Sequence, residues 1–120
     1  MEPQGKLMPD MITKTITEIE AKISNAEAVR PEQRRELLEL LATLKTEIAS
    51  LSKTDEEKAD SIAGFTQVSA HEAVRTKGDP ELRELSLRGL RSSVEDLEQS
   101  HPRLTQIVNR ISKTLSDLGI

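Results

Sequence analysis

Glu98 and His101 are the residues of this 120-residue chain whose types and spacing best fit a chemical role. On a helix, positions three apart share a face, so a Glu-x-x-His pair presents a carboxylate and an imidazole together, which is half of a di-iron carboxylate site. The sequence has no second such pair, so a second copy would have to supply it. Pro102 disturbs the helix at the ligand position. We therefore expect His101 to cap a helix or to lie at the edge of an apolar stripe.

His71 and Glu72 are a second pair of side chains that could exchange a proton, with Arg75 one helical turn further on. No other ionisable group is placed by its spacing to converge on them, so we expect a solvated helix face. The chain contains no phosphate-binding glycine loop, nucleophile elbow or zinc signature. We therefore predict that the protein is not an enzyme, and that it uses no cofactor and no metal.

Basic residues in the C-terminal third could form an anion-binding stripe: Arg83, Arg88, Arg91, Arg103, Arg110 and Lys113. Acidic residues are interspersed with them in equal number: Glu81, Glu84, Glu95, Asp96, Glu98 and Asp117. Mixed signs are typical of a solvated helix surface with scattered i, i+4 pairs. The net charge of −4 also argues against a nucleic-acid partner, because nucleic-acid binders usually carry a basic surface.

The composition favours helices with narrow apolar faces. Apolar residues make up 35% of the chain, charged residues make up 32%, and Phe65 is the single aromatic residue. We therefore expect a core of Leu, Ile, Val and Ala, without the large rings that line ligand pockets. The sequence has no cysteine and no apolar run of the ~20 residues that a membrane span needs. These features predict a cytoplasmic protein without a membrane span.

A repeat of apolar residues from Leu87 to Leu118 is the strongest pattern in the sequence. With His101 in its one gap, the spacing alternates between three and four residues, the heptad pattern of a helix that faces a partner helix. We call these positions the C-terminal seam: Leu87, Leu90, Val94, Leu97, Leu104, Val108, Ile111, Leu115 and Leu118. Monomers usually avoid a long uncovered apolar stripe, so we predict self-association through this seam. A dimer is favoured, and another helical protein is the alternative partner.

The N-terminal half predicts a lead-in followed by a helical hairpin. Residues 1–9 contain two prolines and a glycine, which predict a disordered lead-in. Apolar residues spaced by three and four predict helices over 11–27 and 31–52, with Asp10 as the N-cap of the first. Because the connection between these helices is short, we expect them to form an antiparallel hairpin over 10–52.

The remainder predicts a spacer and a long C-terminal element, in one helical domain over 10–120. Residues 53–79 hold few large apolar side chains, so we expect a weakly helical spacer that is the least stable part. Helices are predicted over 80–118, with a break or kink near 100–102 at Pro102. The heptad phase crosses the proline unbroken, which favours two nearly collinear helices over a sharp reversal.

The C-terminal part resembles a known bacterial family. The motifs are Ser86-Leu87-Arg88, the stretch Val94-Glu95-Asp96-Leu97-Glu98-Gln99-Ser100-His101-Pro102 with its His-Pro step, and the ending Leu115-Ser116-Asp117-Leu118-Gly119-Ile120. Over roughly 86–120 they resemble short bacterial proteins catalogued as domain of unknown function 4404. The resemblance implies a helical hairpin, a variable spacer and a C-terminal helix, and the spacer over 55–80 is longer here than is usual in that family. The family has no assigned activity, so the resemblance implies no catalytic residue.

Together these patterns predict an all-α fold: a helical hairpin plus a long kinked C-terminal helical element, in a coiled-coil-like bundle. The predicted function is a non-enzymatic protein–protein interaction or scaffold domain that self-associates through the C-terminal seam. One alternative is a metal-binding carboxylate and histidine bundle centred on Glu98 and His101. The other is a weak binder of nucleic acid or of an anionic surface, through the basic stripe.

Overall fold

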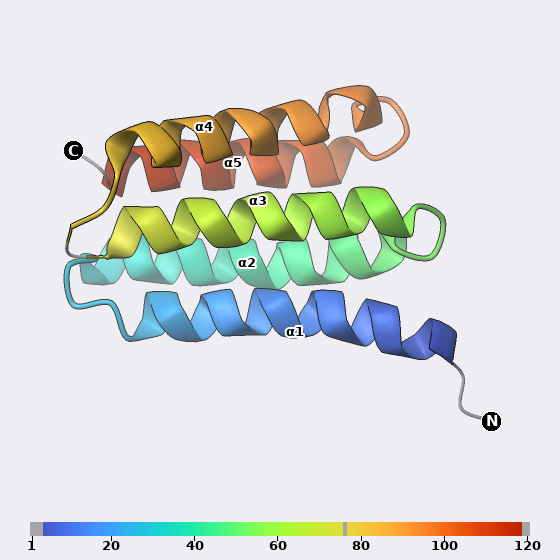
Figure 1. Ribbon diagram of the computed structural model, residues 1–120, viewed down its shortest axis with the longest axis horizontal. Helices are drawn as coiled ribbons and strands as arrows, with labels where there is room; N and C mark the ends of the chain where they lie inside the picture. Colours follow the sequence, from blue (N-terminus) through green and yellow to red (C-terminus); the bar gives the residue numbers. More distant parts are fainter. Residues whose placement is uncertain (1–3, 76, 119–120) are drawn as a thin grey trace.

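The computed structural model describes residues 4–75 and 77–118, with side chains from Met11 onward. Within these residues there are five α-helices, one short 3-10 helix and no strand. The elements are α1 (Gln4–Ser24), α2 (Pro31–Leu51), α3 (Glu56–Val74), α4 (Pro80–Ser93), η1 (Glu95–Leu97) and α5 (Pro102–Leu118). The α-helices lie side by side with their axes roughly aligned, and successive helices run in opposite directions (Figure 1). The prediction of an all-α helical bundle is confirmed.

The first two helices form an antiparallel hairpin (Figure 1). Arg34 closes the turn between them, because its guanidinium donates hydrogen bonds to the carbonyls of Ala26 at 2.6 Å and Val29 at 3.0 Å. The apolar residues spaced by three and four along both helices are buried: Ile12, Ile16, Ile19, Ile23, Leu37, Leu41, Leu44, Ile48 and Leu51. The spacing in the sequence therefore identified the face that each of these helices turns to the core.

The start of α1 differs from the sequence prediction. Residues 4–9 are helical, so the expectation of a disordered lead-in over 1–9 is wrong for them, and residues 1–3 lie outside the described part of the chain. Pro9 is tolerated close to the helix start because its missing N–H removes a single intrahelical hydrogen bond there. Asp10 accordingly lies inside α1 and is not its N-cap, and the helix ends at Ser24 rather than at position 27.

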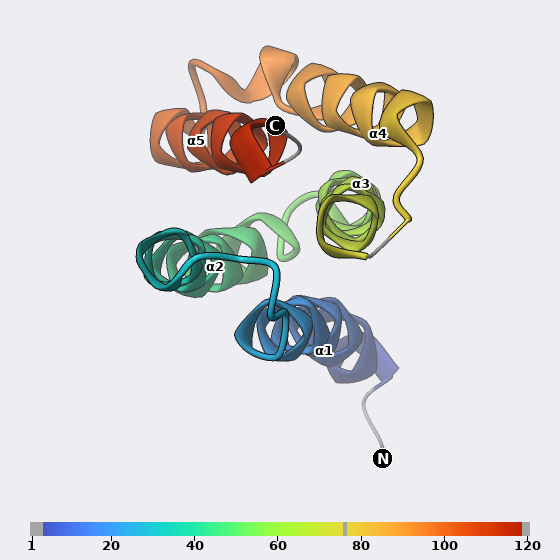
Figure 2. The ribbon, with the colours of Figure 1, turned by 90° about the vertical axis from the view of Figure 1, so that its left-hand side faces the viewer.

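Helix α3 lies at the centre of the bundle, which the sequence did not predict. Among the described helices, it is the one that contacts all four others. Figure 2 shows it between α1 and α4 in the end-on view. Its buried residues are mostly small: Ala59, Ile62, Ala63, Thr66, Ser69, Ala70 and Glu72. Small side chains let several helices approach one axis, so the expectation that 53–79 would have little to bury is wrong.

The C-terminal half contains a reversal where a kink was expected. The break near 100–102 is present, but α5 runs back antiparallel to α4 (Figure 1). The hydroxyl of Thr105 reaches the carbonyl of Val94 across the turn at 3.4 Å. The preference for two nearly collinear helices is therefore wrong. An apolar phase that continues across a proline is compatible with either geometry, because both arms of a hairpin face the same core.

This reversal buries the C-terminal seam inside the chain. Its residues from Leu87 to Leu115 have exposed fractions between 0% and 8%, and Leu118 packs partly buried against the same core. They contact the neighbouring helices of their own chain, so the structure leaves no uncovered stripe along these positions. The argument that made the seam a surface for self-association therefore does not hold.

The turn between α3 and α4 is held by a buried carboxylate. Glu72 is 4% exposed, and its Oε1 accepts hydrogen bonds from the backbone N–H of Asp79 at 2.8 Å and from Nε of Arg75 at 3.0 Å. Asp79 in turn caps α4, accepting from the N–H groups of Glu81 and Leu82. Gly78 packs closely under this turn, because a Cβ at that position would lie 2.3 Å from the backbone oxygen of Glu72.

We expect Gly78→Ala to destabilise the protein by about 2 kcal/mol, because backbone must move to accommodate the new methyl group. For a domain of this size, that is a decrease in melting temperature of about 8 °C. Thermal unfolding followed by circular dichroism measures it. An unchanged melting temperature would show that the turn does not hold Gly78 against the end of α3.

Candidate interaction surface

Glu98 and His101 do not share a helical face in the structure. Glu98 follows η1, and His101 immediately precedes α5, so the segment that joins them is a turn. The ring Nδ1 of His101 lies 3.0 Å from the hydroxyl of its neighbour Ser100. The geometry that suggested half of a di-iron site is therefore not realised, and His101 occupies the capping position before Pro102. Within the described residues, no group of three or more Asp, Glu or His side chains is arranged to hold a metal ion.

His71 and Glu72 point to different partners. Glu72 is engaged by Arg75 and the N–H of Asp79 in the α3–α4 turn, whereas Nδ1 of His71 lies 3.0 Å from Nζ of Lys22 on α1. The two side chains therefore each link α3 to another part of the chain, and they do not form an acid–base pair. The structure gives both a structural role.

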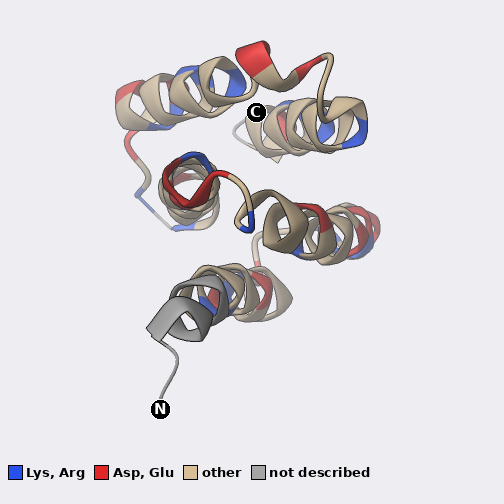
Figure 3. Cartoon of the chain, turned by 90° about the vertical axis from the view of Figure 1, so that its right-hand side faces the viewer, with Lys and Arg blue, Asp and Glu red and all other residues tan. Residues whose placement is uncertain are grey.

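The basic stripe is divided between the two arms of the α4–α5 hairpin. Arg103 pairs with Glu47 at 3.4 Å and Lys113 pairs with Asp117 at 3.5 Å. Figure 3 shows Lys and Arg intermixed with Asp and Glu on the helices rather than gathered on one side. This arrangement matches the mixed, solvated surface that the sequence predicted.

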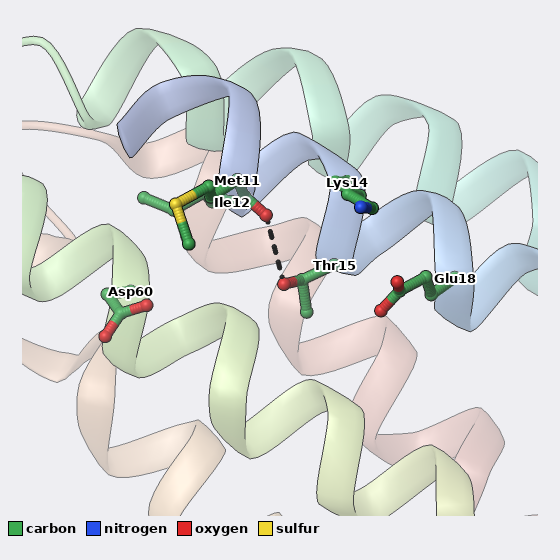
Figure 4. Close-up of a pocket in the computed structure, with 6 residues that line it drawn as sticks. All are labelled: Met11, Ile12, Lys14, Thr15, Glu18 and Asp60. Carbon is green, nitrogen blue, oxygen red and sulfur yellow. Dashed lines mark hydrogen bonds between the residues drawn. The ribbon is translucent and has the colours of Figure 1, made fainter. Parts of the chain in front are cut away.

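A groove of about 290 Å³ lies between α1 and α3. Figure 4 shows Met11, Lys14, Thr15 and Glu18 on α1, with Asp60 across from them on α3. The hydroxyl of Thr15 donates to the carbonyl of Met11 at 3.1 Å, within its own helix. The hydrogen bond of Thr15 therefore stays within α1 and does not bridge the groove to Asp60.

The most distinctive surface feature is a group of exposed apolar side chains on α3 and α4. We call Phe65, Val68, Leu82 and Leu85 the α3–α4 patch; their exposed fractions are 38%, 38%, 40% and 53%. Within the described residues the other large apolar side chain with comparable exposure is Met11, at 59%, on α1. Exposed apolar residues that lie singly need no explanation, whereas residues gathered on one face mark interaction sites.

The four residues of the patch lie on the same outer side of the helix pair. Ser69 and Ser86 mark the buried contact between the two helices, with their hydroxyl oxygens 3.1 Å apart. On α3, Phe65 and Val68 are spaced by three, and Leu82 and Leu85 have the same spacing on α4. Successive residues of an α-helix are rotated by ~100° about its axis, so Phe65 and Val68 lie to one side of Ser69, and Leu82 and Leu85 lie to the corresponding side of Ser86. Because α3 and α4 are antiparallel, both pairs point to the same outer side of the helix pair.

Gly89 extends this surface at the point where the two helices touch. A Cβ at this position would lie 2.4 Å from the ring of Phe65, so the ring rests directly on the backbone of α4. The apolar spacing that was used to find helix faces in the sequence did not identify this patch. The feature of the sequence that could have indicated the patch is the pair Leu82 and Leu85, which precede the C-terminal seam and do not belong to it.

Comparison with known proteins gives one match. The family model described as "Domain of unknown function (DUF4404)" matches residues 12–120. No curated protein and no solved structure matches the chain. None of the described helices is both long enough and apolar enough to cross a membrane.

Proposed function

The chain belongs to the DUF4404 family, a domain of unknown function, and from that premise we propose that it is a non-enzymatic protein-interaction module whose binding face is the α3–α4 patch. The observation that carries the proposal is the gathering of Phe65, Val68, Leu82 and Leu85 on one side of two packed helices. Two helices with apolar residues at i and i+3 form a shallow apolar face that suits a helical partner. A cytoplasmic location is part of the proposal.

The proposal differs from the interaction that the sequence predicted in where the contact lies. The C-terminal seam is occupied by the protein's own helices, so a partner cannot use it without unfolding the α4–α5 hairpin. The α3–α4 patch needs no such rearrangement, because its side chains already face outward. Association through it removes apolar surface from water, at ~25 cal/mol for each Å² buried.

Site-specific photocrosslinking in the native cell tests the proposal. A photoreactive phenylalanine analogue at position 85 is expected to give a covalent adduct, because Leu85 is the most exposed residue of the patch. The matched control is the same analogue at Met11, which is similarly apolar and exposed but lies on α1, outside the patch. An adduct at position 85 in excess over position 11 supports the proposal, whether its mass corresponds to a second copy or to another protein. Equal or absent adducts at the two positions would contradict it.

A further inference from the structure

We propose that the occupant of the α3–α4 patch is a second copy of this chain, with α3 of each copy packed on α4 of the other. This inference rests on the proposed function and names its partner. A two-fold axis that runs along the helix pair, in the plane of the patch, brings the two patches face to face. The product is an isologous dimer with four helices at its interface, the symmetry that most soluble dimers adopt.

The register within one chain fixes the register between two copies. Along the antiparallel pair, Phe65 lies beside Gly89, and Ser69 lies beside Ser86. A rotation about an axis parallel to the helices does not change the position of any residue along that axis, which we call its level. Residues that are level within one chain are therefore also level between α3 of one copy and α4 of the other. Val68 of one copy then lies close to the level of Leu85 in the other. The ring of Phe65, which rests on Gly89 of its own chain, lies at the level of the Phe65 ring in the other copy. Apolar side chains thus meet apolar side chains.

Charge complementarity at the end of the patch supports this arrangement. Arg75 lies six residues after Ser69, and Glu81 lies five residues before Ser86. Because the helices are antiparallel, Arg75 at the end of α3 is therefore nearly level with Glu81 at the start of α4. Both residues are exposed, and the side chain of Arg75 remains 44% accessible while it pairs with Glu72. In the dimer each Arg75 faces the partner's Glu81, and symmetry gives two such pairs. If α3 instead met α3 of the partner in parallel, Arg75 would face Arg75.

The first experiment measures the dimer dissociation constant by sedimentation equilibrium, for the full chain and two matched variants. Leu85→Lys is expected to weaken dimerisation by about a hundredfold or more, because it places a charge at the centre of the contact in both copies. Met11→Lys makes the same change on an exposed residue outside the patch and is expected to leave the constant within about twofold. A full-length chain that is monomeric throughout the concentration series would overturn the inference, as would equal effects of the two variants.

The second experiment tests the register by reversing one charge. Glu81→Arg is expected to weaken the dimer about tenfold, because each Arg75 then faces an arginine in the other copy. The matched control Glu84→Arg makes the same reversal at another exposed position of α4 and is expected to leave the dissociation constant within about twofold. A dimer that depends on Leu85 but responds equally to the two reversals would overturn the packing of α3 on the partner's α4. Photocrosslinking at position 85 to a different protein, with a monomeric purified chain, would overturn the second copy as occupant while leaving the proposed function intact.

Discussion

Leu104→Lys is expected to unfold the protein rather than to dissociate an oligomer. Leu104 is 0% exposed and belongs to the core cluster that joins all the described α-helices. Removing a buried leucine costs ~2–5 kcal/mol, and the lysine adds the cost of an unpaired charge in an apolar interior. The sum is comparable with the whole stability of a domain, which is ~5–15 kcal/mol. Circular dichroism is expected to show loss of the helical signal at 25 °C.

Leu85→Lys is the control for this prediction, since it makes the same substitution at an exposed position of the neighbouring helix. It is expected to retain the full helical signal. If Leu104→Lys were to remain folded with an ordinary melting transition, position 104 would face outward, and the seam would again be a candidate contact between chains.

Ala63→Leu is expected to destabilise the protein by about 3 kcal/mol, a decrease in melting temperature of roughly 12 °C. Ala63 is 2% exposed on α3, the helix that every other described α-helix contacts. A larger side chain there has no space unless a neighbouring helix moves. The free energy of unfolding from denaturant titration measures the effect.

Gly64→Ala is the matched control, one residue further along the same helix. A Cβ at Gly64 would have no atom within 4 Å, so the substitution is expected to raise stability by about 0.5–1 kcal/mol through helix propensity alone. Equal tolerance of leucine at position 63 and alanine at position 64 would show that α3 is loosely packed, as a peripheral spacer would be.

Some helix starts could be predicted from the sequence, although the start and end of α1 could not. Pro31 is the first residue of α2 and Pro80 is the first residue of α4, as the predicted ranges 31–52 and 80–118 have them. The start of α3 is also set locally, because Asp55 caps the helix by accepting from the N–H of Lys58 at 3.0 Å. These features are short-range, because a cap or a proline acts within one turn of its own helix.

The direction of the chain after a break could not be predicted in the same way. The seam residues on both sides of Pro102 keep one apolar phase, and that phase states which face of each helix is buried but not what buries it. In the structure, Leu97 and Leu104 pack into the core of their own chain after the reversal. The inference of an intermolecular seam followed from assuming a straight element.

The spacing of apolar residues also could not predict that α3 lies at the centre of the bundle or that it carries part of the proposed binding face. The small residues Ala59, Ala63 and Ala70 gave a weak pattern because a helix surrounded by others is buried by its neighbours, not by its own large side chains. Phe65 and Val68, two of the few large apolar residues of this stretch, lie on the surface. Recognising a patch requires knowing that α4 lies beside α3, which is a tertiary contact.

The distance between α4 and α5 tests most directly the claim that the C-terminal seam is closed within one chain. The natural chain has no cysteine, so Glu84→Cys with Asp117→Cys gives two unique sites for spin labels, at exposed positions near the open end of the hairpin. Pulsed electron spin resonance, with labelled protein diluted in unlabelled protein, is expected to give about 20–25 Å, since packed helices lie ~8–10 Å apart and the label arms add the rest. A distance near 50 Å, the length of one continuous helix at ~1.5 Å per residue, would contradict the hairpin and expose the seam.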